Sequence, residues 1–464
     1  MSPPRRTVSI AGAGPAGSLL ALLLRRRGFE VRLYERRADP RGQPFDSGRS
    51  INLAMAKRGI HALCHAGVIE HLRDTLIPMR GRMIHDRAGA TSFQPYGRRP
   101  EEVIYSISRH RLNALLIDVA IRQYGARVEF ECEVRGCDAG QHRLELGAPG
   151  AARAPCSQCA ARWVDYEVLI AADGAGSAVR ASLTAAGAVQ ARLEPLAHAY
   201  KELTIPAGPD GGHRMEREAL HIWPRGDFML IALPNPDGTF TATLFLDAAR
   251  LDALRTPEVI DEFLSREFPD AAALMPERVA EFCSHPLGHL ATVYAHPWHT
   301  GRTLLLGDAA HGVVPFHGQG MNCCFEDCVE FDALLDESTQ WEALFAEFTR
   351  RRKPNTDAIA AMALENYLEM RERVADPRFQ LQKRLSLELE RRHPQRFIPR
   401  YTMVSFRHDI GYAEAMRRGQ VQQRILEQLT AAAKDLDEID YAQAAREIEA
   451  GLAPLDSTTI NSSE

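Results

Sequence analysis

The sequence predicts an α/β protein, α+β overall, and three observations carry this prediction. An apolar strand, a glycine-rich turn and a helix open the chain, in the order typical of a βαβ unit. From about residue 195, longer alternating apolar runs indicate an inserted mixed or antiparallel sheet, and from about residue 325 the spacing becomes helical. We therefore expect a Rossmann-like domain, an inserted sheet domain and a helical C-terminal region.

The composition restricts the kinds of partner. The 464 residues carry 56 Lys and Arg against 61 Asp and Glu, a net charge of -5, so the basic excess typical of nucleic-acid binders is missing. The apolar run Ser18–Leu24 is far shorter than the roughly 20 residues that span a bilayer. Nine cysteines without a secretory leader favour reduced thiols. We expect a cytoplasmic protein without a stable membrane anchor that acts on small molecules.

The first 36 residues indicate a dinucleotide site. Strand Thr7–Ala11 leads into three spaced glycines, helix Ser18–Arg27 and strand Phe29–Tyr34. The glycines permit a tight turn, close approach of a pyrophosphate and close packing of helix on strand, and a carboxylate after the second strand can bind ribose. NAD and FAD both use this arrangement, so the cofactor is open at this point. The candidate cofactor residues here are Gly12, Gly14, Ala16, Gly17, Glu35 and Arg36.

Further elements follow from apolar runs and turn residues. Asp237-Gly238 separates two alternating runs and indicates an antiparallel hairpin. Apolar residues spaced by three and four predict helices over 357–373 and 425–436. The predicted strands are Val103–Ile107, Val128–Val134, Tyr166–Ala172, Phe228–Leu233, Thr239–Leu246 and the short run from Thr303 that ends at Asp308.

Two later segments narrow the choice of cofactor. Asp173-Gly174 and Gly307-Asp308 each follow an apolar strand, and the second is followed by Gly318-Gln-Gly-Met-Asn322. Either alone is typical of a turn, but with the first glycine motif the set resembles the class A flavoprotein monooxygenases related to p-hydroxybenzoate hydroxylase. That resemblance implies FAD as cofactor and NADPH as co-substrate. It also implies that these residues contact the cofactor: Arg109 (with Arg111 a close rival), Asp173, Asp308, Pro315, Gly318, Gly320, Met321 and Asn322.

A narrower resemblance, from about residue 7 to about 430, is to the kynurenine 3-monooxygenases. It is carried by 79–83, 94–97, 200–203, 221–224, 315–322, 365–370 and the region of Tyr401. It implies hydroxylation of L-kynurenine to 3-hydroxy-L-kynurenine with O2 through a C4a-hydroperoxyflavin, in tryptophan degradation or in quinolinate-based NAD synthesis. Two alternatives stay open: another class A hydroxylase acting on a benzoate or phenol, and a non-catalytic flavin-binding interaction module.

The same resemblance implies the substrate residues. Arg82, Tyr96, Asn366 and Tyr401 would hold the substrate carboxylate, as suits an arginine fork completed by hydroxyl and amide groups. Asn366 and Met370 are one helical turn apart and share a face. His317 is a candidate for acid or base catalysis, since histidine titrates near neutrality. The remaining candidate pocket residues are Phe316, Met370, Leu233 and Phe245, the last two equally well explained as core packing.

Cysteine clusters suggest no metal site. Cys156 and Cys159 have zinc-like spacing but no second pair, whereas structural zinc takes four ligands. Cys323, Cys324 and Cys328 lie near His311 on the expected helix after the flavin loop, where buried thiols are common. Oligomeric state is open, a homodimer included. The predicted domains are 1–75, 100–190 and 287–335 for FAD, 76–99 and 191–286 for substrate, a helical region 336–455 and a disordered tail 456–464.

Overall fold

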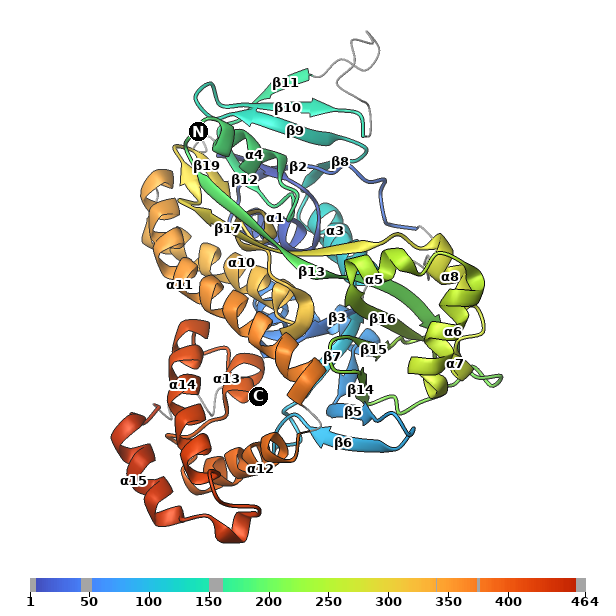
Figure 1. Ribbon diagram of the computed structural model, residues 1–464. Coiled ribbons are helices and arrows are strands. Elements are labelled where there is room, and N and C mark those ends of the chain that lie inside the picture. The colour runs from blue at the N-terminus through green and yellow to red at the C-terminus, as the bar shows by residue number, and fades with distance from the viewer. Residues whose placement is uncertain (1–5, 43–51, 150–161, 339, 374–375, 456–464) are drawn as a thin grey trace. The chain divides into compact units, whose positions relative to one another are not determined.

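The computed structural model describes residues 6–42, 52–149, 162–338, 340–373 and 376–455, and they divide into two compact units (Figure 1). The chain passes between the units once just before Ile77 and four times inside an element, in β7 (Ile104–Ser108), β13 (Gln190–Ile205), β17 (Gly288–His296) and α11 (Trp341–Leu368). The predicted tail 456–464 lies outside the described residues, and the functional assignment of the domains stays a prediction. Unit 1 comprises 1–76, 107–197 and 289–360, and unit 2 comprises 77–106, 198–288 and 361–464.

Unit 1 is built on a mainly parallel six-stranded sheet. Its central strand β1 pairs in parallel with β2 and β12, and α1 (Pro15–Arg26) connects β1 to β2. The predicted βαβ unit is confirmed, although the helix begins at Pro15 because proline is favoured in the first helical turn. In order across the sheet, the strands are β18 (His299–Thr300), β19 (Thr303–Leu305), β12 (Val168–Ala171), β1 (Thr7–Ala11), β2 (Glu30–Tyr34) and β8 (Arg127–Glu129).

Helix α1 is buried on nearly all sides. Its residues from Gly17 to Leu24 are all buried, because α1 packs against α3 (Arg109–Arg122) and α10 (Gly320–Glu337). Such packing explains an apolar run that is not amphipathic. The other helices of unit 1 are α2 (Lys57–Ala66), η1 (Ile69–Thr75), α4 (Ala178–Ala185), α9 (Asp308–His311) and η2 (Pro315–His317), and β3 spans Asn52–Met55.

One predicted strand is divided in the structure. The apolar run over 128–134 forms the end of β8 and the start of β9 (Glu133–Asp138), which belong to different sheets. Glu131, with φ 53°, lies between them in the left-handed region, which a strand cannot contain. Strand β9 forms a three-stranded sheet with β10 (Arg143–Gly147) and β11 (Arg162–Asp165), and α4 packs against β9.

Unit 2 contains a mixed sheet, as predicted for the inserted domain. The strands of this sheet lie in the order β17, β13, β16, β15, β14, β5 and β6. From β13 to β6, only the pair of β14 with β5 is parallel. The predicted hairpin is formed by β15 and β16. The strands are β16 (Phe240–Asp247), β15 (Met229–Pro234), β14 (Ala219–Pro224), β5 (Gly81–His85) and β6 (Thr91–Pro95), while β4 (Ile77–Met79) pairs with β7.

The two faces of this sheet have different roles. Leu230 and Leu244 are cross-strand partners on one face, where they join a buried core that includes Phe263 and Phe268. Because successive strand residues point to opposite faces, Leu233 and Phe245 lie on the other face. The helices that follow β16 are α5 (Ala248–Ala253), α6 (Pro257–Glu267), α7 (Pro269–Leu274) and α8 (Arg278–Ser284).

The C-terminal helices complete unit 2 and have a core of their own, which includes Leu385, Phe397 and Ile448. Helix α11 continues into a π-helical turn, η3 (Glu369–Arg373). The helix predicted over 425–436 ends earlier, since α14 stops at Leu429. The elements are α12 (Pro377–Arg392), α13 (Arg400–Phe406), α14 (Tyr412–Leu429), η4 (Leu436–Glu438) and α15 (Tyr441–Gly451).

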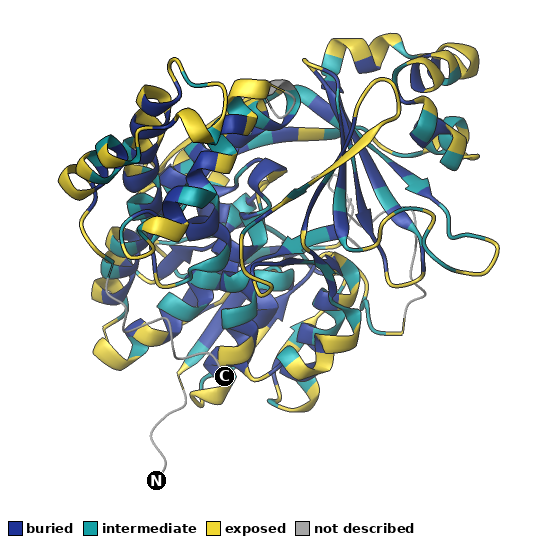
Figure 2. Cartoon of the chain, turned by 90° about the horizontal axis from the view of Figure 1, so that it is seen from below, coloured by how far each residue is buried: buried dark blue, intermediate teal, exposed yellow. Residues whose placement is uncertain are grey.

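Burial follows the amphipathic pattern of these elements. Figure 2 shows the strands mostly in the colours of buried and intermediate residues, with exposed residues on the outer turns of the helices. Among the described residues, no helix is both long enough and apolar enough to cross a lipid bilayer.

Candidate active site

Each of the three glycines of the first turn is explained by a different feature of the structure. Gly12 has φ +91°, and a Cβ there would lie 2.5 Å from the carbonyl oxygen of Ala172. A Cβ at Gly17 would lie 2.1 Å from the carbonyl oxygen of Gly12. At Gly14, by contrast, a Cβ would meet nothing within 4 Å, and this residue precedes α1 without a side-chain cap. The helix therefore presents uncapped amides beside open space, which fits the phosphates of a dinucleotide.

The side chain of Glu35 stabilises this turn through hydrogen bonds from backbone amides. One carboxylate oxygen accepts a hydrogen bond from the amide of Ala13 and the other from the amide of Arg37, both at 2.9 Å. Burial lowers the pKa of the Arg37 guanidinium; Glu35 raises it, and Arg109 and Arg36 lower it further. Arg36 and Arg109 are thus close enough to Arg37, next to the predicted ribose ligand, to act on its charge, and such a group of arginines suits an anionic cofactor. Arg37 was missed by the sequence analysis, although its place next to Arg36 was a signal.

Asp173 begins the second predicted cofactor segment. Its Oδ2 accepts hydrogen bonds from the amides of Ala178 (2.9 Å) and Val179 (3.3 Å), so it fixes the start of α4. Its Oδ1 is buried and has no hydrogen-bond partner among the described residues. Burial raises the pKa of this carboxyl group. Oδ2 of Asp173 thus stabilises the start of α4, and Oδ1 remains as an acceptor for a donor group of a ligand.

The third segment precedes α10. Asp308 is the first residue of α9, and the thiol of Cys324 donates to its Oδ1 at 3.5 Å. Phe316 and His317 are buried in the turn η2, and Gly318 follows with φ +67°, which favours glycine. Helix α10 begins at Gly320 without a side-chain cap, so the positive end of its dipole has no acceptor from the cap side chain. An acid or base role of His317 stays a prediction.

The side chain of Asn322 is fully engaged within unit 1. Its Nδ2 donates to the carbonyl oxygens of Ala54 (2.9 Å) and Gly318 (2.7 Å), and its Oδ1 accepts from the amide of Ala56 at 2.9 Å. Both amide protons are therefore used. Asn322 holds the loop before α10 against β3 and α2, and a contact of this residue with the cofactor stays a prediction.

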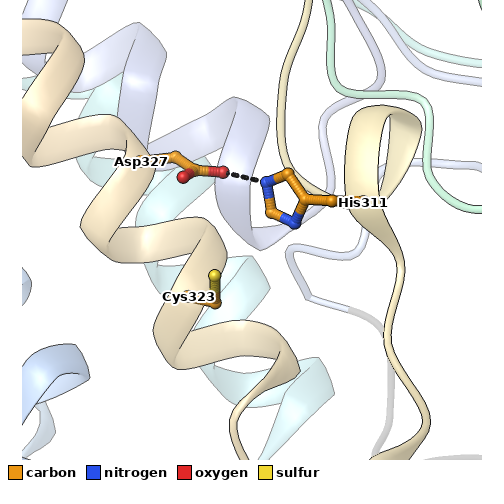
Figure 3. A group of neighbouring side chains, drawn as sticks. All are labelled: His311, Cys323 and Asp327. Carbon is orange, nitrogen blue, oxygen red and sulfur yellow. Dashed lines mark hydrogen bonds and ion pairs between the residues drawn. The ribbon is translucent and has the colours of Figure 1, made fainter. Parts of the chain in front are cut away.

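A buried ionic cluster supports the Asp308 segment. Asp327 accepts from His311 Nε2 at 2.6 Å and from the amide of Gly307 at 3.3 Å (Figure 3). Ligand atoms of His311, Cys323 and Asp327 lie within 4.8 Å of one another, as in a metal site. Arg352, however, donates to the other oxygen of Asp327 at 2.7 Å. The guanidinium is therefore the cation of this cluster, which favours a structural role. Cys156 and Cys159 lie outside the described residues.

Unit 2 brings together the predicted carboxylate ligands. Arg82 on β5 is the cross-strand partner of Leu220, and the register continues through Ile222 and Ile231 to the strands of the hairpin. Arg82 therefore lies on the same sheet face as Leu233 and Phe245, opposite the apolar core. Leu233 and Phe245 are 7% and 4% exposed. They lie outside the main core, on the face of Arg82, although a role in substrate binding stays a prediction.

Arg82 contacts three of the predicted residues. Its guanidinium carbon lies 5.3 Å from the ring centroid of Tyr401 and 5.9 Å from that of Tyr96. Its Nη2 donates to Asn366 Oδ1 at 3.5 Å. Asn366 in turn donates to Met370 Sδ at 3.3 Å, as expected for residues one turn apart on one face. Residues far apart in the sequence, 82, 96, 366 and 401, thus form one cluster, hereafter the Arg82 cluster.

The hydrogen-bonding capacity of this cluster is incomplete. Arg82 is 5% exposed and Tyr96 is 6% exposed, yet Arg82 Nε and Tyr96 Oη have no hydrogen-bond partner among the described residues. Burial raises the pKa of Tyr96 well above its ordinary value and also raises that of Tyr401, so both hydroxyls stay protonated. The two rings are stacked, with centroids 5.3 Å apart. Buried donors without acceptors are costly, and the carboxylate of a ligand is one acceptor that would satisfy them.

Two ionic residues of this cluster were missed by the sequence analysis. Glu369 Oε1 accepts from Arg82 Nη1 at 3.1 Å. Lys383 Nζ lies 5.6 Å from the ring centroid of Tyr401, and burial lowers its pKa while Glu369 raises it. Glu369 follows Asn366 by three residues, which was a signal for a shared helix face. Nothing in the sequence pointed to Lys383. Two cationic side chains thus surround one carboxylate.

Comparisons with known proteins identify the family of this chain. Residues 5–362 match the family model described as FAD binding domain. The chain is 48% identical over 455 residues to kynurenine 3-monooxygenase of Stenotrophomonas maltophilia, covering 97% of this chain and 98% of the relative. It is 47% identical over 461 residues to kynurenine 3-monooxygenase of Xanthomonas axonopodis pv. citri, covering 98% and 99%.

Solved structures show the same fold. Among them is 2-methyl-3-hydroxypyridine-5-carboxylic acid oxygenase, with a TM-score of 0.66 and 19% identity over 82% of this chain and 96% of that one. The predicted fold class and FAD as cofactor are therefore confirmed. With two relatives close to half identical over nearly the whole length, the chain belongs to the kynurenine 3-monooxygenase family of FAD-dependent monooxygenases.

Proposed function

We propose that this enzyme hydroxylates L-kynurenine at ring position 3, with NADPH as electron donor and O2 as oxidant. The observation that carries the proposal is the pair of buried donors, Arg82 Nε and Tyr96 Oη, that have no hydrogen-bond partner among the described residues. A carboxylate has the acceptor geometry that an arginine fork and a phenol hydroxyl complete. The substrate named for both bacterial relatives, kynurenine, carries such a carboxylate.

In unit 1 the proposal assigns cofactor binding to the chain's own groups. The uncapped amides at the start of α1 would bind the pyrophosphate, and Glu35 the ribose. The open N-terminus of α10 would stabilise negative charge on the ring system. Bound FAD supplies the redox chemistry, in which electrons from NADPH activate O2 for transfer of one oxygen atom. Asp173 and Asp308 complete the proposed cofactor ligands.

In unit 2 the chain orients the substrate. Arg82, Tyr96, Asn366 and Tyr401 would fix the carboxylate end. Held there, the substrate keeps one orientation, which gives hydroxylation at a single ring carbon its geometric basis. A role in tryptophan degradation or NAD synthesis and a cytoplasmic location belong to the same proposal.

A coupled assay tests this function. The FAD-loaded protein is titrated with L-kynurenine and, separately, with p-hydroxybenzoate, while the flavin spectrum and NADPH oxidation are followed. We expect kynurenine to perturb the spectrum, to stimulate NADPH oxidation and to yield 3-hydroxykynurenine. A response to p-hydroxybenzoate alone would assign a different aromatic substrate. Binding of FAD without turnover of either compound would favour a non-catalytic flavin-binding module.

A further inference from the structure

Glu369 is an ionised carboxylate inside the Arg82 cluster. It lies on the π-helical turn η3 directly after α11, and its side chain is 18% exposed. Burial raises the pKa of its carboxyl group, but Lys383 and Arg82 outweigh burial and hold that pKa below its ordinary value. A carboxylate this close to the proposed carboxylate ligand Arg82 would repel a simple anionic substrate, so its presence needs a reason.

The arrangement of Arg82 and Glu369 matches an α-amino acid. Arg82 Nη1 and Glu369 Oε1 lie 3.1 Å apart, as a cation and an anion side by side. The carboxylate and ammonium groups of an amino acid are attached to one carbon atom and have a similar spacing. A zwitterion with its carboxylate on Arg82 Nε therefore brings its ammonium group close to the only carboxylate of the described cluster.

We propose that Glu369 binds the α-ammonium group of the substrate and so selects amino acids over simple aromatic acids. The inference rests on the function proposed above and adds a residue that determines specificity. A benzoate would place a second carboxylate beside Glu369 without bringing an ammonium group of its own, which costs binding energy. An amino acid satisfies Arg82 and Glu369 together.

The test compares two ligands that differ only in this ammonium group. L-Kynurenine and its analogue with hydrogen in place of the α-amino group are titrated by calorimetry into the FAD-loaded wild type and Glu369→Gln. A charge-assisted hydrogen bond accounts for about 10- to 100-fold in affinity. We expect Glu369→Gln to weaken kynurenine binding by about that factor and to leave the analogue unchanged or tighter.

A matched control lies one turn earlier. Glu365 is 47% exposed and pairs with Arg400 at 2.5 Å, so Glu365→Gln should change the binding of neither ligand. Equal losses of both ligands in Glu369→Gln would show that Glu369 only positions Arg82, and would overturn the inference while leaving the proposed function intact. Failure of the wild type to bind kynurenine would instead overturn the proposed function. FAD content and melting temperature of each variant check that it is folded.

Discussion

The two buried ionic clusters of this protein differ in how completely their charges are paired. Around Asp327, two arginines, Arg58 and Arg352, form ion pairs with the carboxylate of Glu326. Arg352 also pairs with Asp327, and both oxygens of Asp327 accept hydrogen bonds. In the Arg82 cluster, two cations face one carboxylate, and two buried donors have no acceptor among the described residues. We call the first cluster closed, because its charged groups are paired with one another. We call the second cluster open, because two of its donors have no acceptor among the described residues.

The difference separates a structural site from a binding site. A buried charge is stable only when it is paired and hydrogen-bonded, so a closed cluster stabilises the fold by itself. An open cluster is stable only with the help of another group. For Arg82 we propose that this group is the substrate carboxylate. The variants below test the assignment by removing a charge from the closed cluster or by changing a side chain of the open cluster.

The largest expected effect is on the closed cluster. Asp327→Asn leaves Arg352 and Arg58 with one carboxylate, and we expect the free energy of unfolding to fall by about 3–5 kcal/mol. Urea denaturation measures this change. Asp336→Asn is the control on the same helix, because Asp336 is 71% exposed and its ion pair with Arg27 is screened by solvent, so it should contribute little. Similar losses in both variants would contradict a special role for the buried cluster.

Removing the guanidinium from the open cluster should act on binding. In Arg82→Gln we expect the Kd for kynurenine to rise by about 100- to 1,000-fold, because charge-assisted hydrogen bonds to the carboxylate are lost. Stability should change less than in Asp327→Asn, since Glu369 keeps Lys383 as a cationic neighbour. Arg80→Gln is the control, because Arg80 is 50% exposed and pairs with Glu218. An unchanged Kd in Arg82→Gln would exclude this arginine as the carboxylate ligand.

A third buried carboxyl group, that of Glu390, binds a proton more tightly in the folded state than in the unfolded state. Glu390 on α12 is 1% exposed, and neither carboxylate oxygen has a hydrogen-bond partner among the described residues. Burial raises its pKa to about 7, Glu102 adds to the rise, and Arg99 and Arg98 oppose it. Because the folded state holds this proton more tightly than the unfolded state, stability falls as pH rises from about 4.5 to above 7.

The corresponding variant is Glu390→Gln. We expect the free energy of unfolding of Glu390→Gln, relative to that of the wild type, to rise by about 2–3 kcal/mol as the pH increases from about 5 to about 8.5. Urea denaturation at each pH measures this difference. The control is Glu388→Gln on the same helix. Hydrogen bonds from Arg391 and Arg392 lower the pKa of Glu388 to about 2, so its protonation does not change in this range. A wild type and Glu390→Gln with parallel pH profiles would refute the titration of Glu390.

The smallest expected effect comes from one hydroxyl group. Tyr96→Phe keeps the ring stacked on Tyr401 but removes a buried donor without an acceptor. We expect the ligand-free protein to be equally stable or more stable by about 1 kcal/mol, and the Kd for kynurenine to rise by about 5- to 10-fold. Thermal melting with and without kynurenine measures both quantities. A marked loss of stability without ligand would show that this hydroxyl is already satisfied in the fold.

The sequence predicted local structure better than the pairing of charges. The βαβ unit and the hairpin follow from apolar periodicity and turn residues, and both are confirmed. The break at Glu131 was missed, because a left-handed residue inside an apolar run has no compositional signal. The end of α14 at Leu429 was missed as well, since apolar spacing continues beyond it.

For the site, the resemblance to a family selected residues that the fold brings together in unit 2. Arg82 and Tyr401 are more than three hundred positions apart, and no local pattern joins them. Glu369, Lys383 and the closed cluster of Asp327 were not predicted, because the pairing of buried charges depends on tertiary contacts. Asn322 was predicted from its motif, but only the structure shows that its side chain is used within unit 1.

The central claim is that the open donors of the Arg82 cluster bind the substrate carboxylate. It is tested most directly by changing both the arginine and the carboxylate of the ligand. The affinities of the FAD-loaded wild type and Arg82→Gln are measured for L-kynurenine and for its carboxamide. We predict that the wild type prefers kynurenine by about 100-fold and that Arg82→Gln binds both compounds equally weakly. A preference for the carboxylate that persists in Arg82→Gln would contradict the claim.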